Sequence, residues 1–324
     1  MALTLTEALD NLYTSTWQNM KETVRDQIFD ATPLWWWLKD KGKLKSVEGG
    51  RFITEPLQYA KNDNVSWIGK GGTVSLNDFE FLTIAQFNWR YLVASIVRFG
   101  VDDQQNRGKN QILSLMNAKL DNAQNSLIST LESALAQASG SATNSIDGLQ
   151  LLVKDDPTTS TDVGGINQST YSWWQNKTKN MTGVSFATSG IAEMRTMLNN
   201  TMNNLKMDAP DIICCGQTPY EYYEDTVLDY YRVTNNKLAD AGFQNQTFKG
   251  IPMVWSPSIA NTRMYFLNTN FINFVYDPMM NFDMTEWKPI PDQVNDRAAQ
   301  IILAGSFTVS RRRCQGVMHT IDTP

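Results

Sequence analysis

Residues 84–97, Ile-Ala-Gln-Phe-Asn-Trp-Arg-Tyr-Leu-Val-Ala-Ser-Ile-Val, decide the fold, because large apolar side chains recur there at every second position. The apolar face would carry Phe87, Trp89, Tyr91, Val93 and Val97. The polar face would carry Gln86, Asn88 and Arg90. This period of two predicts a half-buried β-strand. Residues 51–59 predict a partner strand, and the polar, glycine-rich residues 61–77 predict the long tip of a hairpin.

A long helix is expected directly after the hairpin, over residues 103–139. Its apolar side chains recur every three or four residues, at Leu113, Met116, Leu120, Ala123, Leu127, Leu131 and Ala134. Gly140 stands just past the end, where a left-handed C-terminal cap is expected. The helix would span roughly 50 Å. A projecting hairpin followed by a long helix is more typical of a structural subunit than of an enzyme.

The composition favours a protein whose surface is partly covered by neighbouring subunits. The 324 residues are 42% hydrophobic and only 19% charged, and they include 10 Trp. A surface poor in charge loses little solvation when another subunit covers it. The net charge of −5 and the pI of about 5.1 argue against a dedicated nucleic-acid binder. They are compatible with a protein container that encloses nucleic acid without binding it tightly.

The sequence indicates neither export nor membrane insertion. Its first residues are polar and acidic, so no signal peptide is expected. No apolar run approaches the about 20 residues of a membrane-spanning helix. Cys214 and Cys215 are adjacent, Cys314 is distant, and no CxxC motif occurs. We therefore expect buried thiols in a reducing compartment and no membrane partner.

The rest of the chain mixes helical and strand patterns. Further helices are expected at residues 4–30, 189–206 and 218–232, and strands at 210–216, within 246–287, at 298–309 and at 316–321. This order of elements predicts the α+β class, with more than one subdomain for a chain of this length.

No catalytic, cofactor-binding or metal site is predicted. His319 is the only histidine, and no cysteine lies near it at zinc-ligand spacing. Residues 69–73 hold three glycines and a lysine, but not in the order of a phosphate-binding loop. The neighbouring acids of Asp102-Asp103 and Asp155-Asp156 would point apart rather than form a general acid–base pair. A Trp-rich carbohydrate-binding or hydrolytic enzyme, the alternative from a different class, would need such a pair in a cleft.

Two triplets are candidates for contact between subunits. Trp35-Trp36-Trp37 would have either two rings buried and one exposed, or a hydrophobic anchor that docks on a neighbour. Arg311-Arg312-Arg313 would form a solvated turn, a nucleic-acid patch or inter-subunit ion pairs, of which we favour the ion pairs. Together with four hairpin residues, the candidate inter-subunit contacts are Trp35, Trp36, Trp37, Arg51, Lys61, Trp67, Lys70, Arg311, Arg312 and Arg313.

Several local phrases, in this order, are similar to stretches of one protein family: Asp147-Gly-Leu149, Val163-Gly-Gly-Ile166 with Trp173-Trp174, Pro210-Asp-Ile-Ile213, Phe248-Lys-Gly-Ile-Pro252 and Met264-Tyr-Phe-Leu-Asn268. They follow an amphipathic arm, a hairpin and a long helix. The ordered set resembles the major capsid protein of tailed bacteriophages with the HK97-type fold. The resemblance covers nearly the whole chain.

The resemblance implies a division into an N-arm at 1–46, an E-loop at 47–99 that overlaps the adjacent subunit, a P-domain at 100–180 and 291–324 with its spine helix at 103–139, and an A-domain at 181–290 at the capsomer centre. The arm begins without the long charged helical segment that some relatives carry as a fused scaffold, so a separate scaffolding protein is implied. Some relatives crosslink a hairpin lysine to a neighbour's asparagine, which makes Lys61 and Lys70 candidates by position.

On this resemblance, the expected function is that of a non-enzymatic major capsid protein without cofactors. It would self-assemble into hexamers and pentamers of an icosahedral head that encloses double-stranded DNA without sequence-specific binding. A portal and a decoration protein would be further partners. The protein would reside in the virion after assembly in the host cytoplasm. An encapsulin-like bacterial compartment shell shares the fold and is the nearer alternative.

Overall fold

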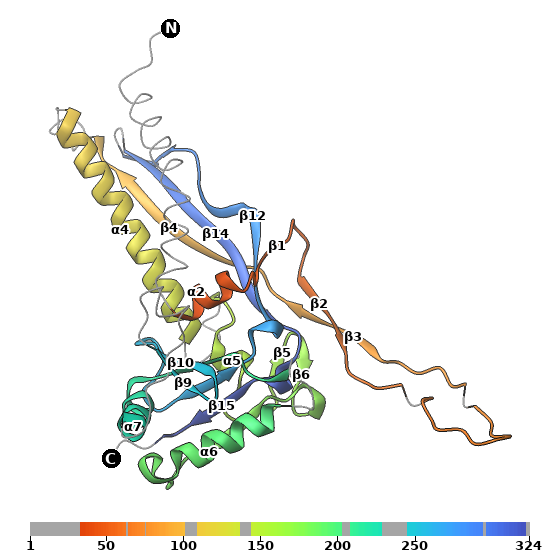
Figure 1. Ribbon diagram of the computed structural model, residues 1–324. Helices are drawn as coiled ribbons and strands as arrows, with labels where there is room; N and C mark the ends of the chain where they lie inside the picture. Colours follow the sequence, from red (N-terminus) through yellow and green to blue (C-terminus); the bar gives the residue numbers. More distant parts are fainter. Residues whose placement is uncertain are drawn as a thin grey trace.

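A computed structural model describes residues 33–62, 64–74, 76–100, 109–136, 144–202, 208–228, 245–293 and 296–321. Two main β-sheets and a set of helices form the body, from which one long hairpin projects (Figure 1). The predicted α+β class is confirmed. The helix expected at residues 4–30, the cap at Gly140 and the acids Asp102 and Asp103 lie outside the described residues.

The first sheet is five-stranded and is centred on β14, which pairs antiparallel with β12 on one side and with β4 on the other. Its strands are β1 Leu44–Ser46, β4 Arg90–Arg98, β12 Ile272–Met284, β13 Lys288–Pro289 and β14 Arg297–Val309. The strand predicted at 298–309 is therefore confirmed. β12 and β14 are 13 residues long each, so the sheet forms an elongated arm (Figure 1).

The helix α4 Lys109–Ala136 runs alongside β4 (Figure 1), and it confirms the predicted long helix over the residues described. Its 28 residues correspond to a length of about 42 Å. Of the expected apolar stripe, Leu120, Ala123, Leu127 and Leu131 are buried. Spacings of three and four residues place these side chains on one face of the helix, which packs on the sheet.

The strand predicted at 84–97 is in fact two strands that belong to different sheets. β3 Leu82–Phe87 pairs with β2 Ile53–Gln58, whereas β4 pairs with β14. Asn88 and Trp89 lie between them outside any strand. The buried face changes at this break: Phe87 is buried, but Tyr91 and Val93 are exposed. The predicted single apolar face is wrong for β4, because the chain joins a different sheet after Asn88 and Trp89 and the opposite set of side chains is buried there.

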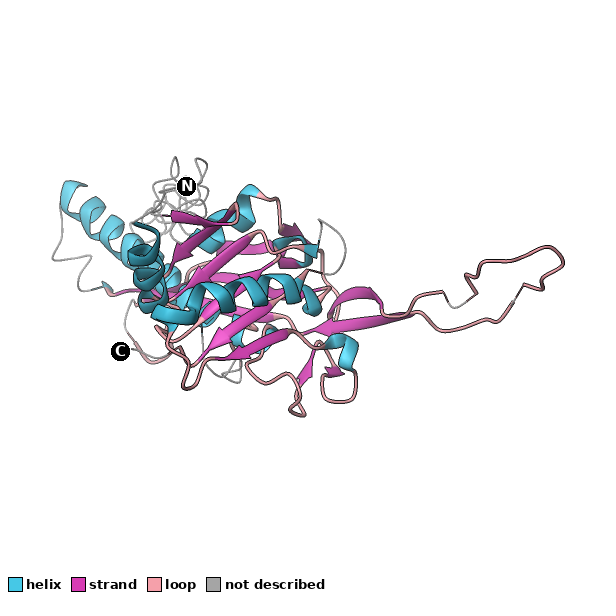
Figure 2. Ribbon diagram, turned by 60° about the horizontal axis from the view of Figure 1, so that its bottom comes forward, coloured by secondary structure: helices cyan, strands magenta, loops and turns pink. Residues whose placement is uncertain are grey.

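The hairpin β2–β3 pairs Ile53 with Phe87 at its base and Gln58 with Leu82 at its outer end. One more backbone bond follows, from Tyr59 N to Phe81 O at 3.1 Å. Beyond it the described residues of the tip form no strand. Figure 2 shows the hairpin extending well clear of the body. The predicted hairpin with a long tip is therefore present.

The second sheet is six-stranded, in the order β7 Lys177–Asn180, β15 Gly316–His319, β11 Met264–Leu267, β8 Ile212–Cys215, β10 Ile251–Trp255 and β9 Asn245–Phe248. All four residues of β8 are buried, as the apolar run at 210–216 predicts. Ile212 and Cys214 belong to the core that the sheet shares with the rest of the body, whereas Ile213 and Cys215 belong to a second core. The sheet therefore separates two cores.

Two helices contribute to the second core, α6 Phe186–Thr201 and α7 Gln217–Leu228. They confirm the helices predicted at 189–206 and 218–232 over the residues described. α6 begins three residues earlier than predicted, and Gly190 lies within its first turns. A Cβ at Gly190 would come within 2.9 Å of the Phe186 ring, so the glycine makes room for that ring.

The remaining elements are short. They are the helices α2 Pro33–Asp40 and α5 Leu149–Leu152, the 3-10 turns η1 Ser172–Trp174, η3 Thr269–Phe271 and η4 Arg312–Cys314, and the two-stranded β5 Asp162–Val163 and β6 Ile166–Asn167. The turn between β5 and β6 and the turn η1 lie at the base of the projecting hairpin (Figure 1). Among the described residues, no helix is long and apolar enough to cross a membrane.

Candidate assembly surfaces

The tip of the hairpin exposes large apolar side chains. Trp67 is fully exposed, and Val65 and Leu76 are 82% and 89% exposed. Large apolar side chains that are exposed on one projecting segment are candidates for a contact with another molecule. Lys61 and Lys70 are also exposed on this tip. Of the sequence candidates, Trp67, Lys61 and Lys70 therefore lie together on one projecting element.

Apolar exposure continues toward the base of the hairpin. Phe81, Leu82 and Ile84 are exposed on its return half. At the start of the outgoing half, Arg51 is exposed, and its guanidinium lies 5.2 Å from the centroid of the Phe52 ring. The hairpin thus offers apolar side chains along its length, with cationic side chains beside them.

The tryptophan triplet lies in α2, and the structure places two of its rings in the core of the subunit. Trp35 and Trp37 are only 1% and 4% exposed. Trp35 contacts Phe274 and Phe307 at ring-centroid distances of 5.0 Å each, and Trp37 Nε1 donates to Asp211 at 3.3 Å. Trp36 is partly exposed. This arrangement matches the alternative of two buried rings, and Trp36 is the least buried ring of the triplet.

We expect Trp35→Ala and Trp36→Ala to have different effects on the unassembled subunit. Trp35→Ala should lower its free energy of unfolding by about 3–5 kcal/mol, because it opens a cavity beside Phe274 and Phe307. Trp36→Ala should lower it far less. Urea unfolding of both variants measures this difference, and equal losses would contradict the placement of the two rings.

The arginine triplet does not form one cluster, because η4 sends the three side chains into different surroundings. Arg311 Nη1 lies 2.5 Å from Asp208 Oδ1, and its guanidinium lies 5.3 Å from the centroid of the Phe271 ring. Arg313 is exposed and has no ion-pair partner among the described residues. Arg312 is 0% exposed. The expectation of inter-subunit ion pairs from all three arginines therefore does not fit Arg312.

Arg312 makes four hydrogen bonds inside its own subunit. Its guanidinium donates to Leu152 O at 2.8 Å, to Trp174 O at 3.0 Å, to Gln168 Oε1 at 3.0 Å and to Asn176 Oδ1 at 3.1 Å. All four acceptors are neutral, and burial lowers the pKa of Arg312 to about 9. The side chain stays charged at neutral pH and joins η4 to the end of α5 and to the segment 168–176.

A cavity of about 460 Å³ lies between the hairpin base and this arginine turn. Its wall includes Lys61, Arg311 and Arg313, and Tyr59 stacks on Trp173 at a ring-centroid distance of 5.3 Å. No acidic side chain is among its described lining residues. The cavity is therefore cationic and aromatic, which suits an acidic segment of a partner.

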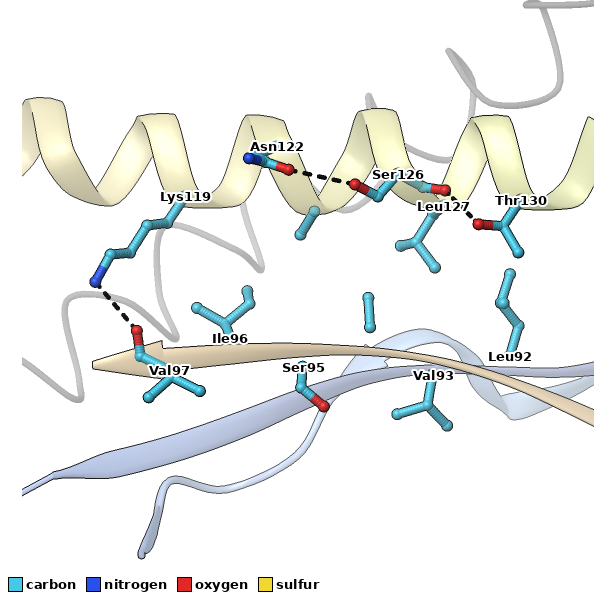
Figure 3. Close-up of a pocket in the computed structure, with 12 residues that line it drawn as sticks. Leu92, Val93, Ser95, Ile96, Val97, Lys119, Asn122, Ser126, Leu127 and Thr130 are labelled. Carbon is cyan, nitrogen blue, oxygen red and sulfur yellow. Dashed lines mark hydrogen bonds between the residues drawn. The ribbon is translucent and has the colours of Figure 1, made fainter. Parts of the chain in front are cut away.

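A second cavity, of about 400 Å³, is the groove between α4 and β4 (Figure 3). Lys119 Nζ donates to Val97 O at 3.1 Å. Asn122, Ser126 and Thr130 face the groove from the helix, and Ser126 Oγ donates to Asn122 Oδ1 at 3.2 Å (Figure 3). Lys119 is the only titratable side chain among the lining residues described. This groove therefore lacks the paired carboxylates that hydrolysis of a glycoside needs.

Asp155, Asp156 and His319, which the sequence analysis considered for catalysis or metal binding, interact with neighbouring side chains. Asp155 forms an ion pair with Arg263 at 2.6 Å, and Asp156 accepts from the Thr158 hydroxyl, a bond that lowers the pKa of this carboxyl. His319 Nδ1 lies 2.9 Å from the Thr320 hydroxyl. No group of three or more possible metal ligands occurs among the described residues.

The three cysteines are buried and free, as expected from the sequence. Burial raises the pKa of Cys314 to about 11, and burial also raises the pKa values of Cys214 and Cys215 well above the usual range. A thiol is reactive as a thiolate, so these cysteines are inert at neutral pH.

Comparison with known proteins gives a consistent answer for the fold. No protein-family model matches the chain, and no curated protein matches it in sequence. Among solved structures, it is similar to the capsid asymmetric unit of cyanophage A-1(L), with 16% identity, a TM-score of 0.61, and coverage of 87% of this chain and 91% of that one.

Two further solved structures are similar over most of both chains. The capsid of a native GTA particle has 9% identity and a TM-score of 0.52, over 87% of this chain and 89% of that one. The holo-SrpI encapsulin complex from Synechococcus elongatus PCC 7942 has 10% identity and a TM-score of 0.50, over 90% and 88%. The chain therefore has the mixed α+β fold of phage capsid proteins, the HK97-like fold that the sequence resemblance implies.

Proposed function

We propose that this chain is the major capsid protein of a tailed bacteriophage. Many copies form the hexamers and pentamers of an icosahedral head that encloses double-stranded DNA. The observation that carries the proposal is the uncovered apolar hairpin tip, with Trp67 and Leu76 in water, on a fold shared with capsid subunits. A lone subunit exposes this surface, and a neighbouring copy is the natural cover for it.

The parts of the chain take the following roles in this proposal: residues 1–46 an N-arm, residues 47–99 the E-loop, residues 100–180 and 291–324 the P-domain, and residues 181–290 the A-domain. α4 is the spine helix. The E-loop overlaps the adjacent subunit in the same ring. A contact between two different surfaces of identical chains closes into a ring when the rotation per subunit divides a full turn.

The contact residues that we propose are Trp36, Arg51, Lys61, Trp67, Lys70, Arg311 and Arg313, all of which are at least partly exposed. Trp35, Trp37 and Arg312 act inside the subunit instead. The cationic cavity beside Arg313 receives acidic side chains from a neighbour, in keeping with the excess of acids over bases in the chain.

Further partners belong to the same proposal. They are a separate scaffolding protein, a portal and a decoration protein, and the chain resides in the virion after assembly in the host cytoplasm. The role is structural and uses no cofactor. Neither of the two cavities described above is lined by the pair of carboxylates that a Trp-rich carbohydrate hydrolase would require.

An encapsulin-like compartment shell is the second candidate, favoured by the similarity to the SrpI encapsulin. The two functions differ in what the shell contains. Shells isolated from the natural source should contain double-stranded DNA if the chain is a phage coat, and an enzyme cargo if it is a compartment. Nucleic-acid staining and mass spectrometry of the same particles distinguish them.

The proposal is tested by the size distribution of the purified protein. Sedimentation velocity over a range of salt and protein concentrations, with and without the scaffolding protein, should show rings or shells. A compact monomer under every condition would contradict the proposed function.

The unassembled chain is expected to bind duplex DNA only weakly. Tight binding needs basic side chains that displace counterions from phosphates, but this chain has a net charge of −5, a buried Arg312 and an Arg311 paired with Asp208. Fluorescence anisotropy at physiological salt should give a dissociation constant no tighter than about 10⁻⁶ M. Sub-micromolar DNA binding that is lost in Arg311→Gln and Arg313→Gln would contradict the proposal that the shell encloses DNA without binding it tightly.

A further inference from the structure

The projecting hairpin rests on two short segments of the body at its base. On one strand, Gln86 N donates to Gly164 O at 2.9 Å in the turn between β5 and β6. On the other strand, the ring of Tyr59 stacks on Trp173 of η1, with centroids 5.3 Å apart and planes 24° apart. The hairpin is thus held on both strands, at Gln86 near its base and at Tyr59, where its backbone pairing ends.

Gly164 approaches the hairpin closely. A Cβ at this position would lie 3.0 Å from a carbon of the Phe87 ring and 3.1 Å from Ala85 Cβ, both in β3. Phe87 and Ala85 are buried, so neither can move aside into solvent. The adjacent Gly165 also has a positive φ, +73° against +62° for Gly164, but it has open space around its Cβ position. Only Gly164 of the two therefore touches the hairpin.

The segments beneath the hairpin are fixed in turn by buried hydrogen bonds. Trp174 Nε1 donates to Val163 O at 2.9 Å, which ties η1 to the β5–β6 turn. Arg312 donates to Trp174 O at 3.0 Å and to the buried Gln168 at 3.0 Å. A continuous series of contacts therefore runs from Arg312 through Trp174 and the turn to the hairpin.

We propose that the β5–β6 turn and η1, held by Arg312, form a platform that sets the direction in which the hairpin leaves the body. Gly164 and Arg312 are positioning residues in this device. The consequence for assembly rests on the proposed function: every hairpin in a shell must meet its neighbour at the same place, so a fixed direction favours one shell curvature.

The direction of the hairpin can be measured in the full chain before it assembles. Spin labels at Asp78→Cys on the hairpin and Thr196→Cys on α6 report their separation by pulsed electron resonance, and the native cysteines are buried. Gly164→Ala should shift and broaden this distance distribution. Gly165→Ala, which carries a similar backbone strain, should leave it unchanged and serves as the matched control.

A second variant covers the case in which Gly164→Ala does not fold. Trp173→Leu removes the ring that stacks on Tyr59, and it should broaden the same distribution. Unchanged distributions in Gly164→Ala and Trp173→Leu, or equal changes in both glycine variants, would overturn the platform. If a displaced hairpin still gave normal shells, its role in curvature would be wrong. A wild-type chain with a narrow distribution that never assembles would support the platform and count against the capsid function.

Discussion

Replacing residues 61–79 with Asn-Gly is expected to leave a folded subunit that no longer forms stable shells. Ala60 and Glu80 face each other across the hairpin, because Tyr59 N donates to Phe81 O, so a two-residue turn can join them. The removed tip includes the exposed Val65, Trp67 and Leu76 and contributes no residue to either core. Subunit stability should therefore be preserved while the proposed contact with the neighbour is lost.

The comparison needs two measurements on one variant. Thermal unfolding of the unassembled subunit should match the wild type, and sedimentation should show a loss of large particles. Trp67→Ala should weaken assembly in the same direction, whereas Trp255→Ala, an exposed tryptophan on the body, is the matched control. Normal particles from the shortened hairpin would contradict its role in bonding neighbours.

Arg312→Met is expected to destabilise the subunit strongly. The change removes the donor for four hydrogen bonds and leaves their buried acceptors, among them Leu152 O and Trp174 O, without this partner. Each unsatisfied buried polar group costs about 1–3 kcal/mol. Allowing for relaxation, the free energy of unfolding should fall by about 3–5 kcal/mol. Urea unfolding of the unassembled subunit measures this loss.

The adjacent Arg313→Met provides the control, since Arg313 is exposed and unpaired among the described residues. It should change subunit stability by less than about 0.5 kcal/mol, as surface substitutions usually do. If both variants unfolded at the same denaturant concentration, the buried position of Arg312 would be wrong.

The elements with strong local patterns were predictable from the sequence. The long helix has an uninterrupted apolar stripe, and β8 is a continuous apolar run because both its faces are buried. The break at Asn88 and Trp89 was not predictable, because the alternation of side chains passes through it without a glycine or proline. The change of partner from β2 to β14 is a tertiary effect that local spacing does not record.

The candidate contact surfaces were also predictable from the sequence only in part. The exposed hairpin tip follows from the polar, glycine-rich sequence around Trp67. The two triplets do not reveal which member is buried, because identical residues carry identical signals. Trp36 differs from Trp35, and Arg313 from Arg312, only through the elements packed against them. The platform at Gly164 was equally hidden, since the adjacent glycines are equivalent in sequence but only one touches the hairpin.

Electron cryo-microscopy of the purified protein tests most directly the central claim that the chain assembles into shells. We predict closed shells built from rings of five and six subunits, in which each hairpin lies across the adjacent subunit and Trp67 is covered by it. A well-dispersed monomer, or shells in which the hairpin and Trp67 remain in solvent, would contradict the account.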